Sequence, residues 1–143
     1  MMGGAQSTMG RLRVGTNLVR VADIGQSIET FGDRYLTRVY TPDELSTCRA
    51  GEGWTVERLA SRFAAKEAVT KVLRPLDGLS YQSIEVTLDD HGAPTLLLHG
   101  AARQRAEALG LQETSVSMSH EGEYAVAIVA AVFASDNDPR NRK

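Results

Sequence analysis

The chain has 143 residues, 42% of them hydrophobic and 24% charged, and its formal net charge of −2 argues against a general nucleic-acid binder, which would carry a basic excess. Its length suits one domain, which we place at residues 11–134 between a polar leader (residues 1–10) and a polar tail (residues 135–143). Cys48 is the only cysteine, no run approaches the ~20 apolar residues of a membrane span, and the N-terminus lacks a signal-peptide core, so we expect a cytoplasmic protein without internal disulfides.

The first predicted element is a strand over residues 12–21, where apolar and β-branched side chains predominate. Gly15 lies inside this strand, and an interior glycine often marks a bulge or the close approach of another backbone or a ligand. Asn17 follows two residues later, so its side chain points to the same face of the strand. Taken alone, Asn17 is most simply a polar residue at a bulge or a strand end.

A helix, a short break and a second segment that is either helical or a turn are predicted over residues 23–40. Asp23 lies near the N-cap of the first segment, and Gly32 marks the break between the two. Thr41 and Glu44 then predict the start of another helix, because a threonine at the N-cap and a glutamate three residues later form a capping box.

The longest helical pattern covers residues 58–73, after a predicted loop at residues 49–54. Glu67 lies at the edge of its apolar stripe, and Lys71 follows one turn later. One interpretation is a surface ion pair worth a few tenths of a kcal/mol. The other is that both residues belong to a functional site, because the small side chains of Ala64 and Ala65 would let another group approach the helix closely. The stripe recurs at three- and four-residue spacing and consists of Val56, Leu59, Ala60, Phe63, Ala64 and Ala68.

The second half of the chain predicts two antiparallel hairpins on either side of a short helix. We interpret His91 and His99 as a turn residue and a strand-end residue. The predicted fold class is α+β, with a mostly antiparallel sheet packed against a long central helix. The elements are strands at residues 84–88 and 95–99, a helix at residues 101–110, and strands at residues 115–120 and 124–133.

Few residues in the sequence carry chemistry. The chain contains no GxGxxG or Walker-type loop, no serine elbow, no HExxH and no CxxC motif. The polar side chains that stand at the ends or edges of predicted elements are Asn17, Glu67, Lys71 and His120.

Four segments of the sequence resemble the holo-acyl-carrier-protein synthases, the small single-domain class of 4′-phosphopantetheinyl transferases. The segments are GTNLVRVADI, RYLTRVYTPDEL, RFAAKEAVTK and SVSMSH, and they occur in the family's order and spacing. The resemblance covers residues 13–131, and RFAAKEAVTK is its most specific part. It implies the fold of the 4′-phosphopantetheinyl transferases.

The resemblance implies an enzyme that moves the phosphopantetheine arm of coenzyme A to a serine of an apo acyl or peptidyl carrier protein and releases 3′,5′-ADP. It also implies a homotrimer with active sites at subunit interfaces, Mg²⁺ on the coenzyme A pyrophosphate, and a role in fatty acid or polyketide biosynthesis. Phosphoryl transfer needs positioning and charge neutralisation, which a carboxylate-held Mg²⁺ and a lysine provide.

Site residues follow from the same resemblance, position by position. Glu67 matches the magnesium-ligand glutamate, and Lys71 matches the lysine on the phosphates. A water next to Glu67 would accept the serine proton. His120 matches the histidine beside the coenzyme pocket. The other coenzyme-binding positions are Arg62 and Phe63, on the long helix, and Gly92 and Pro94, in the turn near the adenine.

Two positions depart from the family pattern. Asn17 replaces an aspartate that is the second magnesium ligand, and an amide oxygen brings no negative charge. Asp23 replaces an arginine that meets acidic residues of the carrier, and like charges repel. Arg20 stands where an acidic residue is common in the family. The positive charge of the replaced arginine has therefore either moved to Arg20 or been lost.

Three interpretations follow from these residues. The first is a working transferase with a weakened metal site and a specialised carrier. The second is a relative that binds coenzyme A or a carrier protein but has lost this transfer, or does other chemistry on a carrier-bound or coenzyme-bound substrate. The third, an oligomer without a ligand, fits poorly with the retention of Glu67, Lys71 and His120.

Overall fold

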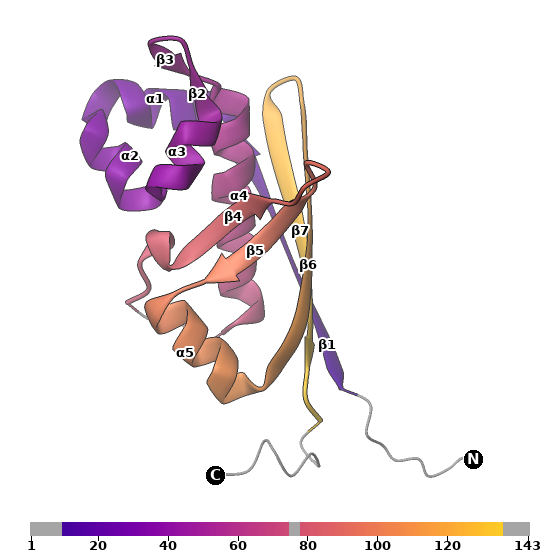
Figure 1. The fold of residues 1–143 in the computed structure, drawn as a ribbon. Helices are drawn as coiled ribbons and strands as arrows, with labels where there is room; N and C mark the ends of the chain where they lie inside the picture. Colours follow the sequence, from indigo (N-terminus) through magenta and orange to yellow (C-terminus); the bar gives the residue numbers. More distant parts are fainter. Residues whose placement is uncertain (1–9, 75–77, 136–143) are drawn as a thin grey trace.

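The computed structural model describes residues 10–74 and 78–135. The predicted leader, apart from Gly10, and the predicted tail, apart from Ser135, lie outside the described residues. The described chain forms an α+β fold, as predicted, in which helices and hairpins cover one side of an antiparallel sheet (Figure 1). Within the described residues, no helix is long and apolar enough to cross a membrane.

The main sheet has three antiparallel strands in the order β1-β7-β6. Their alternating side chains make a buried inner face, with Val19 and Val129, and an outer face. The strand predicted at residues 115–120 is longer in the structure and begins at Leu111. The three strands are β1 (Arg11–Arg20), β7 (Tyr124–Phe133) and β6 (Leu111–Glu121).

Helix α4 (Val56–Val72) crosses the inner face of this sheet and forms the centre of the molecule (Figure 1). Gly15 on β1 is the point of closest approach, because a Cβ atom there would lie 2.3 Å from the Ala68 carbonyl oxygen. Of the alternatives that an interior strand glycine suggests, the structure thus shows the close approach of another backbone. A larger residue at this position would push the strand away from the helix.

The β4–β5 hairpin packs on α4 through β4 and against β6 of the main sheet through β5 (Figure 1). It joins β4 (Ile84–Leu88) to β5 (Pro94–Leu98) through a turn in which Gly92 has a φ of 82°, a conformation that favours glycine. A short 3₁₀ helix, η1 (Tyr81–Ser83), leads into β4 and was not predicted.

Helices α1 (Val21–Phe31), α2 (Asp33–Val39) and α3 (Pro42–Cys48) pack at one end of α4. The break at Gly32 is confirmed, and its φ is 54°. Asp23 lies in the first turn of α1 rather than at its N-cap, which is Arg20, because β1 runs directly into the helix.

Several local signals in the sequence correspond to the observed elements. The predicted capping box of α3 is present: Glu44 N donates to Thr41 Oγ1 at 3.2 Å, and Thr41 N donates to Glu44 Oε1 at 2.9 Å. Helix α5 (Gly100–Leu109) ends at Gly110, whose left-handed conformation was expected of a C-cap. The predicted loop at residues 49–54 contains a small hairpin of β2 (Arg49–Ala50) and β3 (Gly53–Trp54).

Helix α4 is buried on more than the single stripe that its spacing predicted. The side chain of Lys66 is 0% exposed and lies 2.7 Å from Glu44 Oε1, in a buried ion pair. Its ammonium also donates to the carbonyl oxygens of Tyr81 and Ile84. Burial lowers the pKa of Lys66, an effect that the neighbouring Glu44 carboxylate opposes.

The buried polar network continues from Lys66 into the β4–β5 hairpin. Glu85 Oε2 accepts from Thr41 Oγ1 at 2.9 Å, and Glu85 Oε1 lies 2.9 Å from His99 Nε2. His99 follows the last residue of β5, as expected of a strand-end residue, and it helps to enclose this network. The charges therefore have partners, as buried ionic groups require.

Candidate functional site

The contact between β1 and α4 brings two predicted site residues together. Lys71 Nζ donates to the Thr16 carbonyl oxygen at 2.7 Å and to Asn17 Oδ1 at 3.3 Å. The close approach at Gly15 makes these bonds possible, because it lays the strand against the last turns of the helix. Lys71 is solvent-exposed, so its ammonium remains accessible to an anionic ligand.

Glu67 lies one helical turn before Lys71, on the same side of α4. Its Oε1 atom accepts a hydrogen bond of 3.1 Å from the hydroxyl of Tyr81, at the start of η1. The Tyr81 ring also packs against Phe63, with ring centroids 5.5 Å apart. Burial raises the pKa of Tyr81, and the Glu67 carboxylate raises it further, so the phenol stays protonated and donates.

The oxygen atoms of Asn17 and Glu67 are the donors available to a cation in this cluster. Within the described residues, no group of three or more histidine, cysteine, aspartate or glutamate side chains is placed to hold a metal. One carboxylate and one amide oxygen nevertheless fit Mg²⁺, which takes few protein ligands and completes its shell with waters and substrate phosphates. A softer transition metal would favour nitrogen or sulfur donors.

A groove of about 280 Å³ lies between α4 and the β4–β5 turn, beside β6. It collects three of the predicted coenzyme-binding residues: Arg62, Gly92 and Pro94. Arg62 is buried and donates to the Arg58 carbonyl oxygen at 3.2 Å, whereas its Nε atom is buried without a hydrogen-bond partner among the described residues. The groove is completed by Thr47, Arg58, Leu88 and Met118, none of which the sequence analysis singled out.

Phe63, another predicted coenzyme-binding residue, lies on α4 but does not line this groove. Its ring faces Tyr81, so it belongs with the Glu67 side of the helix. Arg62 and Phe63 are adjacent in sequence, and successive helical residues point in directions about 100° apart. Arg62 therefore lines the groove, whereas Phe63 packs against Tyr81 on another side of the helix.

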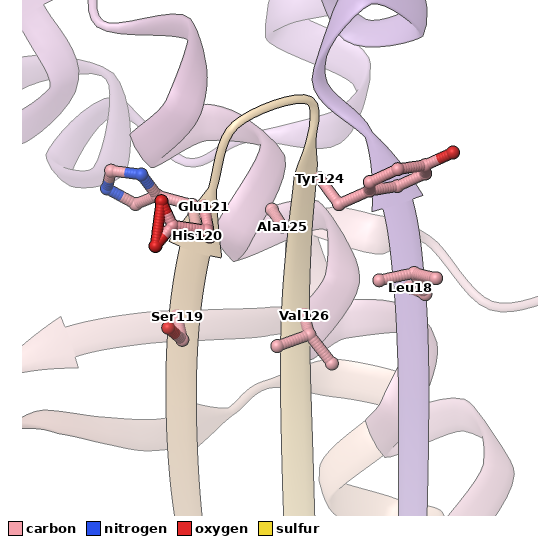
Figure 2. Close-up of a pocket in the computed structure, with 7 residues that line it drawn as sticks. All are labelled: Leu18, Ser119, His120, Glu121, Tyr124, Ala125 and Val126. Atoms are coloured by element: carbon pink, nitrogen blue, oxygen red, sulfur yellow. The ribbon is translucent and has the colours of Figure 1, made fainter.

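His120 lies close to the β6–β7 turn, on the same face of the sheet as Asn17 but two strands away. It is exposed and lines a hollow of about 190 Å³ (Figure 2). In Figure 2, His120 projects beside β6, whereas Leu18 and Tyr124 project at the β1 side of the hollow. Within the part of the chain that the structure describes, no hydrogen bond or ion pair links His120 to Glu67, so a single chain presents them as two separate clusters.

A further hollow of about 210 Å³ lies on the first two helices and carries positive charge. Phe31 and Tyr35 supply aromatic surface, and the exposed Arg34 and Arg38 supply the charge. The Arg34 guanidinium lies 5.9 Å from the centre of the Phe31 ring, as in a cation–π contact. The sequence analysis placed no functional residue here.

Sequence reasoning also missed the roles of Tyr81 and Lys66. Tyr81 precedes a strand in a stretch without periodic pattern, and only its approach to α4 reveals a partner for Glu67. Lys66 lies between two alanines and a glutamate, and a lysine there is ordinarily exposed. The signal that could have identified it is the capping glutamate Glu44, which needs a buried counter-charge once α3 packs on α4.

Comparisons with known proteins give a consistent result. The family model described as the 4′-phosphopantetheinyl transferase superfamily matches residues 13–129. The holo-acyl-carrier-protein synthase of Halorhodospira halophila is 45% identical over 121 residues, which cover 83% of this chain and 95% of that protein. The synthase of the same name from Koribacter versatilis is 43% identical over 120 residues, covering 82% and 95%.

The fold resembles that of solved synthases. The crystal structure of the Helicobacter pylori holo-acyl-carrier-protein synthase in complex with coenzyme A matches with a TM-score of 0.73 and 27% sequence identity. The match covers 83% of this chain and 99% of that chain. The similarity therefore extends over nearly the whole described fold.

Proposed function

The chain belongs to the 4′-phosphopantetheinyl transferase superfamily, as a holo-acyl-carrier-protein synthase-type transferase, and we propose that it moves the 4′-phosphopantetheine arm of coenzyme A to a serine of an apo carrier protein. The observation that supports this most is the clustering of Asn17, Glu67 and Lys71 where β1 meets α4. The reaction would release 3′,5′-ADP, and we expect it to take place in the cytoplasm.

In this proposal the serine oxygen of the carrier attacks the phosphorus that bears the pantetheine arm. A new oxygen–phosphorus bond forms as the bond to the bridging pyrophosphate oxygen breaks, and 3′,5′-ADP leaves. Glu67 accepts the serine proton, directly or through a water, and Lys71 offsets the negative charge on the phosphates. Asn17 and Glu67 would hold Mg²⁺, which when bound supplies further charge neutralisation on the pyrophosphate.

The coenzyme is proposed to occupy the groove between α4 and the β4–β5 turn. Arg58 and Arg62 give this groove two positive charges, which suit the phosphates of coenzyme A. The buried Nε atom of Arg62 is a donor without a partner among the described residues, and an anionic ligand would satisfy it. Gly92 and Pro94 offer a flat turn surface for the adenine end.

A homotrimer is part of the proposal because the outer face of the main sheet is unusually apolar. Its strands expose Leu12 (66%), Val14 (60%), Leu18 (63%) and Ile128 (48%), all on one face by strand register. Figure 1 shows no helix over this face within the described residues. A second copy of the chain is the proposed occupant, because a hydrophobic sheet face of this kind suits a symmetric oligomer interface.

His120 fits this assembly. The hollow that it lines at the β6–β7 turn includes Leu18, Tyr124 and Val126, which belong to the apolar outer face, although the strand register places the His120 side chain on the inner face. We therefore expect His120 to act beside the coenzyme of a neighbouring copy, so that each active site is built from two chains. This accounts for the separation of His120 from Glu67 within one chain.

The carrier protein is proposed to dock on the first two helices. Phe31 and the cations Arg34 and Arg38 form a basic surface with an aromatic centre, which suits an acidic partner helix. Arg20 is less available for this role, because its guanidinium lies 3.5 Å from Glu123 Oε1 and over the Tyr124 ring. The charge lost at Asp23 is thus better replaced by Arg34 and Arg38.

The test is a transfer assay with the purified chain, coenzyme A, Mg²⁺ and apo acyl and peptidyl carriers, followed by mass spectrometry of the carrier. We expect the carrier to gain the mass of the phosphopantetheine arm. Glu67→Gln is the matched variant, since it removes the carboxylate charge at constant size, and transfer should fall at least about 100-fold.

Two outcomes would contradict the proposal. A Glu67→Gln variant that keeps the parent rate would place the metal and the base elsewhere. A parent chain that binds coenzyme A but loads none of the carriers would favour the second interpretation, in which the chain binds these partners without this transfer.

A further inference from the structure

The hydrogen bond between Tyr81 and Glu67 points to a role for Tyr81 beyond packing. We propose that Tyr81 is a positioning residue that fixes the Glu67 carboxylate in the orientation required for the divalent cation. The inference rests on the proposed function, in which Glu67 is the carboxylate ligand of that cation. It adds a residue that acts through Glu67 and does not itself touch the substrate.

The Tyr81 hydroxyl donates to one oxygen of Glu67 over 3.1 Å. A carboxylate is planar, so a bond that holds Oε1 also sets the direction of Oε2. A free glutamate side chain samples several rotamers, and ordering it on metal binding costs conformational entropy. A hydrogen bond from a neighbouring group reduces that cost, which is how outer groups commonly orient metal ligands.

Tyr81 can orient Glu67 only if it is itself held firmly, and the structure holds it from several sides. Lys66 Nζ donates to the Tyr81 carbonyl oxygen at 3.1 Å, and Lys66 is in turn paired with Glu44. The next residue, Gln82, donates from its side chain to the Tyr40 carbonyl oxygen at 3.0 Å. Two neighbouring residues of α4, Lys66 and Glu67, therefore bind Tyr81 by its main chain and by its hydroxyl.

The ring of Tyr81 has a separate anchor in Phe63, at a centroid distance of 5.5 Å. Removing the hydroxyl should therefore leave the ring in place, and Tyr81→Phe becomes a clean variant. The importance of one oriented carboxylate is greater in this chain than in its family, because Asn17 provides a neutral oxygen where the resemblance expects a second carboxylate.

A different result is expected if the Tyr81 hydroxyl only stabilises the fold. In that case Tyr81→Phe would lower the melting temperature and leave metal affinity unchanged. Tyr40→Phe is the control, because the Tyr40 hydroxyl bonds the Leu59 carbonyl oxygen at 3.0 Å and the Tyr35 hydroxyl at 3.1 Å rather than the Glu67 carboxylate. Its removal should cost stability, about 1 kcal/mol, without changing metal affinity.

The experiment measures binding of Mn²⁺, used as a paramagnetic probe for the divalent cation, to the full chain with and without coenzyme A. We expect Tyr81→Phe to weaken Mn²⁺ binding about tenfold or more, and Tyr40→Phe to leave it unchanged. In the transfer assay, the metal concentration for half the maximal rate should rise in parallel, while the rate at saturating metal stays near the parent value.

The outcomes separate this inference from the function on which it rests. If the parent binds Mn²⁺ and loads a carrier, and Tyr81→Phe binds Mn²⁺ as tightly as the parent, only the inference is overturned. It is also overturned if Tyr40→Phe weakens Mn²⁺ equally, since general loosening would then explain the loss. If the parent loads no carrier, the proposed function fails, and the Mn²⁺ titrations still decide whether Tyr81 orients Glu67.

A second measurement needs no variant. Mn²⁺ should broaden the ring resonances of Tyr81 in the NMR spectrum of the unmodified chain before those of Tyr40. Even if Tyr81→Phe does not fold, this measurement shows whether the cation binds beside Tyr81, as the inference requires. Equal broadening of the two rings, or none, would overturn the inference.

Discussion

Asn17 differs from the aspartate of the family pattern only by an amide NH₂ group in place of a carboxylate oxygen. Its Oδ1 atom accepts a hydrogen bond of 3.3 Å from Lys71 Nζ, so the amide already contacts the positively charged ammonium group of the candidate site. A carboxylate at the same place would add a full negative charge at nearly the same volume. The substitution Asn17→Asp therefore changes charge and little else.

We predict that Asn17→Asp tightens the divalent cation and raises the transfer rate at low Mg²⁺. A gain of ~1.4 kcal/mol in the transition state corresponds to about a tenfold higher rate. The measurement is the rate as a function of Mg²⁺ concentration, together with Mn²⁺ affinity. Asn17→Ala is the control, because it removes the oxygen donor and should weaken both.

A different result would identify a different obstacle. If Asn17→Asp binds the cation more tightly but still loads no carrier, metal affinity is not the missing step. Carrier docking is then the next step to examine, through the double variant that also carries Asp23→Arg. No gain in cation affinity would show that position 17 does not face the metal.

At the scale of elements, helices α1 and α2 present the surface proposed for the carrier protein. Gly32 separates them with a φ of 54°, a conformation that favours glycine. Phe31 at the end of α1 and Arg34 on α2 lie on either side of this break, with the Arg34 guanidinium 5.9 Å from the centre of the Phe31 ring.

We predict that the double variant Arg34→Glu with Arg38→Glu raises KM for the carrier roughly tenfold and leaves KM for coenzyme A unchanged. Reversing two charges opposite an acidic helix turns attraction into repulsion, which mainly slows association. Steady-state kinetics with each substrate varied in turn would measure the effect. Arg103→Glu on α5 is a control charge reversal, because it lies outside this surface and should affect neither KM.

Helix α4 shows how one element serves two purposes. Its middle turns bury the Lys66–Glu44 ion pair, and its exposed edge presents Glu67 and Lys71. Losing one partner of a buried pair commonly costs about 3–5 kcal/mol, because the other charge is then stranded. The rigidity of the helix interior thus supports the position of the site at its edge.

At the scale of the whole molecule, the outer face of the main sheet is apolar, although a single copy of the chain leaves it exposed to solvent. Leu12, Val14 and Leu18 on β1 and Ile128 on β7 remain exposed, although alternation would allow polar residues there. The strand at residues 124–133 is likewise apolar on both faces. An oligomer that covers this face resolves the discrepancy.

We predict that the chain sediments as a trimer at micromolar concentration and that Leu18→Arg shifts it toward the monomer. A buried arginine without a counter-charge would be costly in a hydrophobic interface. Analytical ultracentrifugation measures the state directly, and transfer activity should fall with the trimer. Leu97→Arg, at an exposed leucine of β5, is the control and should leave the trimer intact.

A parent chain that sediments only as a monomer would contradict this arrangement. It would also remove the explanation for His120, which lies apart from Glu67 within one chain. His120 would then require a contact made only when coenzyme or carrier binds.

The sequence alone determined most of the local structure, because caps, turns and periodicity act over a few residues. The capping box at Thr41, the break at Gly32, the C-cap at Gly110 and the final strand at residues 124–133 all followed from neighbours in the chain. The family also followed from the sequence, because the motif containing Glu67 and Lys71 is contiguous.

Only the tertiary structure decided which distant residues share a partner. The burial of Lys66 depends on Glu44 and on the β4–β5 hairpin, and the bond from Tyr81 to Glu67 depends on where η1 lies against α4. The separation of Arg62 from Phe63 follows from helix geometry together with what packs on each side. These features join residues far apart in sequence, and no local pattern encodes such contacts, because their free energy arises only when the elements pack together.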